Sequence, residues 1–212
     1  MKVIIVSGGN KPSEKLLKSY IEDDDIIIGV DKGCNALFDY NIKPNLILGD
    51  FDSIKKEILD YFKKSDVTIE KYKPEKDYTD TDLGYRKAKE IFNASKILLF
   101  GATGSRIDHT LGNIGILFRA LKDNIKMEII DDNNRIYLVN KNSIIKKEEG
   151  KVISFHALSD IVKNFTIKNA KYSLTNYDMT TLEPRAICNE FLDKDIEITF
   201  DSGIVLVMYT LD

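Results

Sequence analysis

Short apolar runs alternate with amphipathic helical stretches over the first 130 residues, and this alternation limits the possible folds more than any other feature of the sequence. Runs with the length and composition of strands occupy residues 3–6, 26–30, 46–48, 67–69, 97–100 and 127–130. Helical patterns occupy residues 13–21, 33–40, 54–62, 80–92 and 111–121, with Ser13 and Ser53 as expected N-caps. Strands that alternate with helices are typical of a mostly parallel sheet covered by helices on both faces.

The pattern changes after about residue 131, because no long helical stripe remains in the sequence. Short β-rich runs, separated by polar turns, occupy residues 136–139, 152–156, 165–167, 196–200 and 204–209. Several short strands at fairly regular spacing are typical of a small β-sandwich. The fold class we expect is therefore α/β plus all-β, with a Rossmann-like parallel α/β domain over residues 1–130 and a small C-terminal β-sandwich over residues 131–212.

The overall composition excludes some classes of function. The 212 residues are 43% hydrophobic and 31% charged, which is ordinary for a globular protein. A net charge of −3 and a pI near 5.6 provide no bulk attraction to nucleic acid. The apolar run at the amino terminus is too short for a signal peptide or a membrane span. Cys34 and Cys188 lie far apart without metal-ligand spacing, so we expect free thiols and a cytoplasmic location.

Aspartate is concentrated in three short segments, each beside a predicted strand or helix. The first, residues 49–53 with the sequence GDFDS, directly follows the predicted strand 46–48. The carboxyl ends of strands are where α/β sheets bind ligands, and Asp50 and Asp52 lie on one side of an extended backbone. Close carboxylates repel each other unless a cation lies between them, and Mg²⁺ typically joins carboxylates to phosphates. The alternative is a turn in which both aspartates form local hydrogen bonds.

The second segment, residues 76–82 with the sequence KDYTDTD, opens the predicted helix 80–92. Thr79 and Asp82 fit a capping box, in which Asp82 reaches back toward the cap, so we expect both to be structural. Asp77 and Asp80 are not needed for that cap, and they are candidates for metal or ligand contact. Lys76 either neutralises a phosphate or balances the local charge.

The third segment, residues 101–109 with the sequence GATGSRIDH, forms a turn before a predicted helix. Glycines let a ligand approach the backbone closely, and the planar guanidinium group of Arg106 matches phosphate oxygens. Asp108 either caps the following helix or binds a metal, whereas His109 is more typical of a packed or hydrogen-bonded histidine than of a base. The segment lacks the Gly-Lys-Ser/Thr ending of a P-loop, so any nucleotide chemistry proceeds without one.

Together these segments resemble the thiamine pyrophosphokinase family. The resembling stretches, in order, are residues 30–34 (VDKGC), 42–53 (IKPNLILGDFDS), 76–80 (KDYTD), 104–113 (GSRIDHTLGN), 171–174 (KYSL) and 188–190 (CNE). One such motif is a weak signal, but several in register are difficult to obtain by chance. The family usually has serine at the position of Cys188 and often glutamate at the position of Asp82.

The resemblance implies transfer of the pyrophosphoryl group of ATP to the hydroxyl of thiamine, which gives thiamine diphosphate and AMP. It implies Mg²⁺ held against the phosphates by Asp50, Asp52 and Asp77. The other catalytic positions that it implies are Asp80, Arg106 and Asp108. The positions implied on the nucleotide side are Gly8, Gly9, Asn10, Asp31, Gly33, Ser53, Lys76, Thr79, His109 and Asn113.

The second domain is expected to bind the vitamin. Thiamine carries a permanent positive charge on flat rings, so an aromatic face or a carboxylate should contact it. By resemblance, the contacts are Tyr172, Cys188, Asn189 and Glu190, although Tyr172 is equally consistent with packing inside the domain. The resemblance also implies a homodimer, in which each site forms between the first domain of one chain and the second domain of its mate.

Two other functions are compatible with part of the pattern. A strand followed by Asp50 and Asp52 also resembles the nucleophile loop of haloacid-dehalogenase-like Mg-dependent phosphatases, with Asp131 and Asp132 as a late acidic pair. That loop normally opens the chain, and the second and third aspartate segments would have no role in such an enzyme. A non-catalytic sensor of thiamine diphosphate or nucleotide could lose its metal ligands, whereas this chain has every metal candidate.

Overall fold

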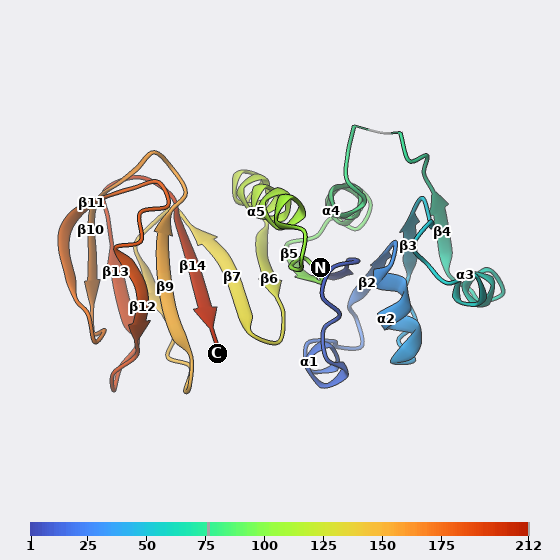
Figure 1. Ribbon diagram of the computed structural model, residues 1–212, viewed down its shortest axis with the longest axis horizontal. Coiled ribbons are helices and arrows are strands. Elements are labelled where there is room, and N and C mark those ends of the chain that lie inside the picture. The colour runs from blue at the N-terminus through green and yellow to red at the C-terminus, as the bar shows by residue number, and fades with distance from the viewer. Residues whose placement is uncertain (76, 212) are drawn as a thin grey trace. The chain divides into compact units, whose positions relative to one another are not determined.

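The computed structural model describes residues 1–75 and 77–211, which form two compact units, Met1–Asp132 and Asn133–Asp212 (Figure 1). The fold combines a large sheet, which carries the parallel strands, with a separate antiparallel sheet of four strands. Lys76, which the sequence predicted to contact phosphate, lies outside the described residues. No helix among the described residues is long and apolar enough to cross a membrane.

Six parallel strands of the described chain form the sheet of the first unit. In chain order they are β1 (Lys2–Val6), β2 (Ile26–Val30), β3 (Leu46–Gly49), β4 (Thr68–Lys71), β5 (Lys96–Phe100) and β6 (Lys126–Ile130). In space they follow the order β6-β5-β1-β2-β3-β4, and each neighbouring pair is parallel. The chain therefore winds outward from β1 in one direction through β4, then returns and winds in the other direction through β5 and β6. Open α/β sheets typically bind ligands at such a reversal, beside the carboxyl ends of the strands.

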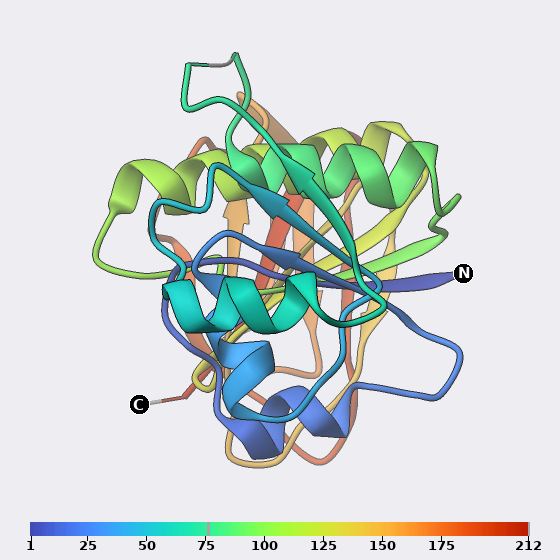
Figure 2. The same ribbon diagram turned by 90° about the vertical axis from the view of Figure 1, so that its right-hand side faces the viewer.

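The helices between these strands cover both faces of the sheet, as Figure 2 shows. They are α1 (Glu14–Ser19), α2 (Gly33–Asp39), α3 (Lys56–Lys63), α4 (Asp80–Glu90) and α5 (Ile107–Lys122). α4 and α5 lie on one face, and α1, α2 and α3 lie on the other. Ile4, Val6 and Phe100 of the strands pack with Leu17 and Leu37 of the helices in one buried cluster. Each such buried side chain contributes about 1.5–3 kcal/mol, so the ends of β1 and β5 are held firmly.

The helix starts confirm two expected caps and correct a third. Ser13 and Thr79 both cap helices, since their hydroxyl oxygens accept backbone N–H groups of the first turn. The helix predicted at 54–62 begins instead at Lys56, so Ser53 is not its N-cap. Ser53 donates its hydroxyl hydrogen to Asp52 Oδ1 at 2.7 Å. This serine therefore belongs to the loop that carries the carboxylates.

The second unit consists of antiparallel strands. They are β7 (Asn134–Val139), β8 (Ser143–Ile145), β9 (Val152–Ala157), β10 (Ile161–Lys168), β11 (Leu174–Thr180), β12 (Ala186–Glu190), β13 (Ile196–Thr199) and β14 (Val205–Thr210). One set follows the order β12-β9-β14-β7 and the other β11-β10-β13-β8. Both sets contribute to one apolar core, in which the rings of Phe155 and Phe165 meet edge to face at 5.8 Å. No sequence pattern predicted β8, β11 and β12; β11 buries only Met179, so it has no apolar run to detect.

Candidate active site

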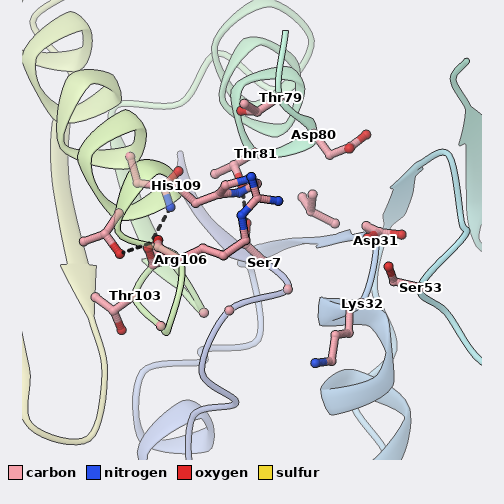
Figure 3. A pocket seen from close by; sticks show the side chains of 18 of the residues that line it. Ser7, Asp31, Lys32, Ser53, Thr79, Asp80, Thr81, Thr103, Arg106 and His109 are labelled. Carbon is pink, nitrogen blue, oxygen red and sulfur yellow. Dashed lines mark hydrogen bonds between the residues drawn. The ribbon is translucent and has the colours of Figure 1, made fainter. Parts of the chain in front are cut away.

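A polar pocket of about 700 Å³ lies at the carboxyl ends of the parallel strands in the first unit. The segments that follow β1, β2, β3 and β5 line it, together with the first residues of α4 and α5 (Figure 3). Residues from all three aspartate segments therefore line one pocket. The predicted residues that line this pocket are Gly8, Gly9, Asn10, Asp31, Asp50, Asp52, Ser53, Thr79, Asp80, Arg106, His109 and Asn113.

Close contact between two loops forms one wall of this pocket. The backbone N–H of Gly9 donates to the carbonyl of Gly101 at 2.8 Å, and that of Asn10 donates to the carbonyl of Thr103 at 2.7 Å. A Cβ atom on Gly9 would lie 2.2 Å from the carbonyl oxygen of Thr103, so no other residue fits without moving the backbone. Glycine at this position is therefore required for the loops after β1 and β5 to meet.

Three carboxylates meet at the opposite side of the pocket. Asp31, Asp50 and Asp52 each have an oxygen within 4.8 Å of an oxygen of the others. Asp31 has φ of 46° and Phe51 has φ of 63°, so the backbone turns sharply at both loops. A bulky residue such as Phe51 rarely adopts a positive φ, and backbone strain of this kind is common at functional sites.

Asp31 is the least satisfied member of this group. Its Oδ1 atom is buried, and no hydrogen-bond partner for it exists among the described residues. Burial raises the pKa of the Asp31 carboxyl above its usual value, and the negative charges of Asp50, Asp52 and Asp80 raise it further. The hydrogen bond from the backbone N–H of Lys32 acts in the opposite direction. A bound cation would satisfy the free oxygen and remove the repulsion.

The group of carboxylates fits a hard divalent cation such as Mg²⁺, which prefers oxygen ligands. The sequence predicted Asp77 as the third ligand, but Asp77 is exposed and does not line the pocket. Asp31 stands beside Asp50 and Asp52 instead. The order of the strands explains why Asp31 lies beside Asp50 and Asp52. β2 and β3 are parallel neighbours, and the N–H of Asp31 donates to the carbonyl of Leu48. Residues that end adjacent parallel strands share one edge.

The first turn of α4 presents polar groups to the pocket, while Asp82 faces away from it. Thr79, Asp80 and Thr81 line the pocket, and the hydroxyl of Thr81 lies 3.0 Å from that of Ser7. The guanidinium group of Arg119 binds both oxygens of Asp82, at 2.7 and 3.0 Å. The carboxylate of Asp82 is thus structural as predicted, but it joins α4 to α5 rather than reaching back to the cap.

The start of α5 supplies a cation to the pocket. The guanidinium of Arg106 forms an ion pair with Asp108 at 2.6 Å, and both side chains are exposed. This hydrogen bond holds the pKa of the Asp108 carboxyl below its usual value. Asp108 itself does not line the pocket. Asn113 is buried, and its amide donates to the carbonyl of Ala102 at 2.7 Å, so it fixes the loop.

Gly33 and Lys32 differ in their relation to the pocket. Gly33 does not line it, and a Cβ atom there would lie 2.0 Å from the carbonyl oxygen of Val6, so this glycine lets α2 pack against β1. Lys32 does line the pocket, although its place in a motif predicted no role for it. The hydroxyl-bearing Ser7, Thr81 and Thr103 were also missed, because single hydroxyl residues carry no distinctive pattern.

The predicted vitamin contacts lie in the second unit and differ in their exposure and in their bonding partners. Tyr172 and Asn189 line a pocket of about 480 Å³, and the Tyr172 side chain is 58% exposed. Asn189 is only 2% exposed, and its side chain binds the backbone of Tyr172 through both the N–H at 3.0 Å and the carbonyl at 2.7 Å. Glu190 pairs with Lys171 at 2.6 Å, and Cys188 is exposed with φ of 54°.

The fold and the pocket define a class: an α/β protein with an acidic, glycine-lined ligand site where its parallel sheet reverses direction. The family profile described as "Thiamin pyrophosphokinase, catalytic domain" matches residues 17–129, and "Thiamin pyrophosphokinase, vitamin B1 binding domain" matches residues 141–205. The chain belongs to the thiamine pyrophosphokinase family.

Individual relatives agree with this assignment over the whole chain. Thiamine pyrophosphokinase of Bacillus subtilis is 36% identical over 215 aligned residues, which cover 100% of both proteins. A crystal structure of thiamine pyrophosphokinase from Bacillus subtilis matches with a TM-score of 0.91 at 33% identity, covering 100% of both chains. A thiamin pyrophosphokinase family protein from Enterococcus faecalis matches with a TM-score of 0.86 at 30% identity, again over 100% of both chains.

Proposed function

We propose that this chain transfers the pyrophosphoryl group of ATP to the hydroxyl of thiamine, forming thiamine diphosphate and AMP. The observation that carries this proposal is the group of Asp31, Asp50 and Asp52 with its unpartnered buried oxygen, in a pocket where the sheet reverses. Family membership supports the same reaction. The phosphatase and the sensor described above are not favoured.

Each unit has one task in this proposal. The first, a Rossmann-like parallel α/β domain over residues 1–130, binds ATP with Mg²⁺, and the family profile for the catalytic domain supports this. The second, a small β-sandwich over residues 131–212, binds thiamine, and the profile for the vitamin-binding domain supports this. The loops after β1 and β5, with Gly8, Gly9 and Asn10, line the pocket, and we assign the nucleotide to the end that they form.

We infer that Asp31, Asp50 and Asp52 hold the magnesium ion. Asp80 lies in the same pocket and adds negative charge near Asp31. When bound, Mg²⁺ neutralises phosphate charge and keeps the phosphates in a fixed orientation. Asp77 remains a candidate for contact with the substrate rather than with this ion, because it is exposed outside the pocket lining.

In the proposed reaction, the hydroxyl oxygen of thiamine forms a bond to the β-phosphorus of ATP. The bond between that phosphorus and the oxygen of the α-phosphate breaks, AMP leaves with the electron pair, and the hydroxyl proton passes to solvent. Such transfers depend mainly on positioning and charge neutralisation. Arg106 reaches the pocket from the start of α5 and can bind phosphate oxygens with its planar guanidinium, while Asp108 holds it in place.

The vitamin contacts in this proposal have separate roles. The exposed ring of Tyr172 offers a face to the cationic rings of thiamine. Asn189 positions Tyr172, because its amide is already bonded to the backbone of that residue. Glu190 supplies a carboxylate nearby, paired with Lys171 in the ligand-free chain. Cys188 stands where the family usually has serine.

We further propose that the active protein is a homodimer with sites shared between chains, working in the cytoplasm. Exposed apolar side chains on both units, such as Leu111 and Ile187, are consistent with a partner. Mixing an Asp52→Asn protein with a Tyr172→Ala protein, and allowing subunits to exchange, tests this. The assay is run at a thiamine concentration well below the raised KM of the Tyr172→Ala protein, where both variants alone have low activity. If sites are shared, mixed dimers have one intact site and regain activity; if each chain builds its own site, activity stays as low as in the separate variants.

The test of the reaction itself is mass spectrometry of the protein with ATP, Mg²⁺ and thiamine. Thiamine diphosphate formed together with AMP supports pyrophosphoryl transfer. ADP with thiamine monophosphate would mean that the γ-phosphate moves instead, and the mechanism would be wrong. Phosphate release that does not depend on thiamine would favour the phosphatase, and no turnover at all would favour the sensor.

A further inference from the structure

Lys32 is a cation on the wall of the acidic pocket, and the proposed reaction leaves it without a role. Its side chain is exposed and lines the pocket. No described residue forms a hydrogen bond or an ion pair with its ammonium group. Arg106, the other lysine or arginine in the described lining, is engaged by Asp108 at 2.6 Å. Of these two cations of the described lining, Arg106 is held by Asp108 and already has a phosphate contact in the proposed reaction, whereas Lys32 is held by no carboxylate and has no assigned partner.

The backbone separates Lys32 from the carboxylate that precedes it. Asp31 has φ of 46°, and Lys32 then has φ of −55° as the residue before the first turn of α2. In Figure 3 the Asp31 carboxylate lies beside Ser53, whereas the Lys32 side chain points away from both of these residues. Two adjacent residues of opposite charge thus serve different parts of the pocket instead of neutralising each other.

Gly8 determines where the stem of Lys32 lies. A Cβ atom built on Gly8 would lie 3.0 Å from Cβ of Lys32, a distance that real side chains rarely tolerate. The lysine stem therefore packs against the glycine loop after β1. The ammonium group is carried into the pocket from the side of this loop, which the proposed function assigns to the nucleotide.

The distribution of charge indicates which phosphate needs Lys32. Asp31, Asp50 and Asp52 gather at the metal side of the pocket, where the transferred phosphates would bind through Mg²⁺. The α-phosphate, joined to the nucleoside, would lie toward the glycine loop and away from that ion. A phosphate without its own cation in an acidic pocket would be strongly repelled.

We propose that Lys32 binds the α-phosphate of ATP and stabilises AMP as the leaving group. The inference rests on the proposed function. When the bond between the β-phosphorus and the bridging oxygen breaks, the electron pair remains on that oxygen and AMP gains a negative charge. An ammonium group fixed beside this phosphate interacts more strongly with the transition state than with bound ATP, so it accelerates the transfer.

The experiment compares Lys32→Met and Lys32→Arg with Lys43→Met as the control. Lys43 is an exposed lysine of the same unit that lines no part of this pocket. We expect Lys32→Met to lower kcat by about 10²-fold and to weaken inhibition by AMP by about 10-fold or more. Inhibition by inorganic pyrophosphate and the KM for thiamine should stay unchanged, and Lys32→Arg should keep most of the activity.

Direct calorimetric titration of each protein with AMP separates this inference from the proposed function. If the parent protein forms no thiamine diphosphate, the proposed function fails, and AMP affinity alone then decides the role of Lys32. If the parent protein is active and Lys32→Met keeps its kcat and its AMP affinity, the inference is wrong. Equal weakening of AMP and pyrophosphate inhibition would also overturn it, because Lys32 would then serve the pocket in general.

Discussion

The acidic end of the first-unit pocket and the vitamin motif of the second unit contrast in how well their side chains are satisfied. Asp31 has a buried oxygen without a partner and is surrounded by other carboxylates. Asn189 is also buried, but both ends of its amide are bonded to the backbone of Tyr172. The first group has an oxygen without a partner, whereas in the second both the oxygen and the nitrogen of the amide have one.

We expect this difference to separate a group that acts on a ligand from a group that holds the fold. An unpaired buried charge destabilises the free protein and is retained only where something bound to it repays that cost. The Asn189 amide already holds the backbone of Tyr172, so we expect its effect on the vitamin to be transmitted through that residue. The two regions should therefore respond differently to substitution, and the predictions below measure that difference.

The largest expected effect is on catalysis at the acidic end. Asp52→Asn should lower kcat by about 10²-fold or more, because it removes a carboxylate proposed to hold Mg²⁺ against the phosphates. The exposed side chain forms a local bond with Ser53, so the melting temperature should change little. Steady-state kinetics at saturating Mg²⁺, with circular dichroism to monitor the fold, measure both quantities.

A matched control for this variant is Asp60→Asn on α3. Asp60 is a partly exposed carboxylate that pairs with Lys63 at 3.5 Å and does not line the pocket. It should keep full activity. If Asp52→Asn retained parent turnover at saturating Mg²⁺, the carboxylate group would not be the metal site, and the contrast between the two regions would lose its basis.

The next effect is on stability, in the second unit. Asn189→Ala should destabilise the protein by about 1–3 kcal/mol, because the N–H and the carbonyl of Tyr172 both lose their bonding partner. The KM for thiamine should also rise, because the Tyr172 ring is no longer held. Urea denaturation and thiamine titration of the initial rate are the two measurements.

Tyr172→Ala is the comparison for that variant. Its side chain is 58% exposed, so it should raise the KM for thiamine without a comparable loss of stability. A result in which Asn189→Ala raised the KM but left the denaturation midpoint unchanged would show that Asn189 contacts the vitamin directly. The vitamin motif and the acidic end of the pocket would then both act through side chains that contact the ligand directly.

The sequence predicted all six strands of the first unit, because these depend on local periodicity, whereas β8, β11 and β12 of the second unit were missed. It also predicted that the first aspartate segment directly follows the strand that is β3. The predicted strand at 26–30 coincides with β2, and Thr79 caps α4 as expected. The sequence did not predict the ion pair between Asp82 and Arg119, because Arg119 lies 37 residues further along the chain. It also did not predict that Asp31 lies beside Asp50 and Asp52, because this grouping depends on the order of the strands in the sheet. Long-range pairing of this kind leaves no mark on a local pattern.

The third effect is a gain in stability. Asp31→Asn should raise the melting temperature of the metal-free protein, by about 2–4 °C for each 1 kcal/mol of repulsion removed. The raised pKa means that the native state binds the Asp31 proton more tightly than the unfolded state does. Stability of the parent protein therefore falls as pH rises above about 4, through the raised pKa, and remains lower beyond it.

Thermal melts across this pH range, with and without Mg²⁺, distinguish the outcomes. Mg²⁺ should stabilise the parent protein most at high pH, where the carboxylate is ionised, and should stabilise Asp31→Asn much less. Equal stabilisation of both proteins by Mg²⁺ would remove Asp31 from the metal site. A lower melting temperature for metal-free Asp31→Asn would mean that the Asp31 carboxylate stabilises the metal-free protein, contrary to what its unpartnered oxygen predicts.

The smallest effect is expected at Cys188, where the resemblance implies that the family usually has serine. Cys188 has φ of 54° in β12, where the pairing with β9 is irregular, and its N–H donates to Ser154 Oγ at 3.0 Å. Serine has nearly the same shape and the same backbone strain, so Cys188→Ser should change stability by less than about 0.5 kcal/mol. In that case the backbone conformation at Cys188, and not its thiol, determines the structure of the vitamin motif at this position. A large fall in the KM for thiamine would instead assign a direct contact to the serine hydroxyl, and Cys188→Gly, which relieves the strain without adding a hydroxyl, separates these explanations.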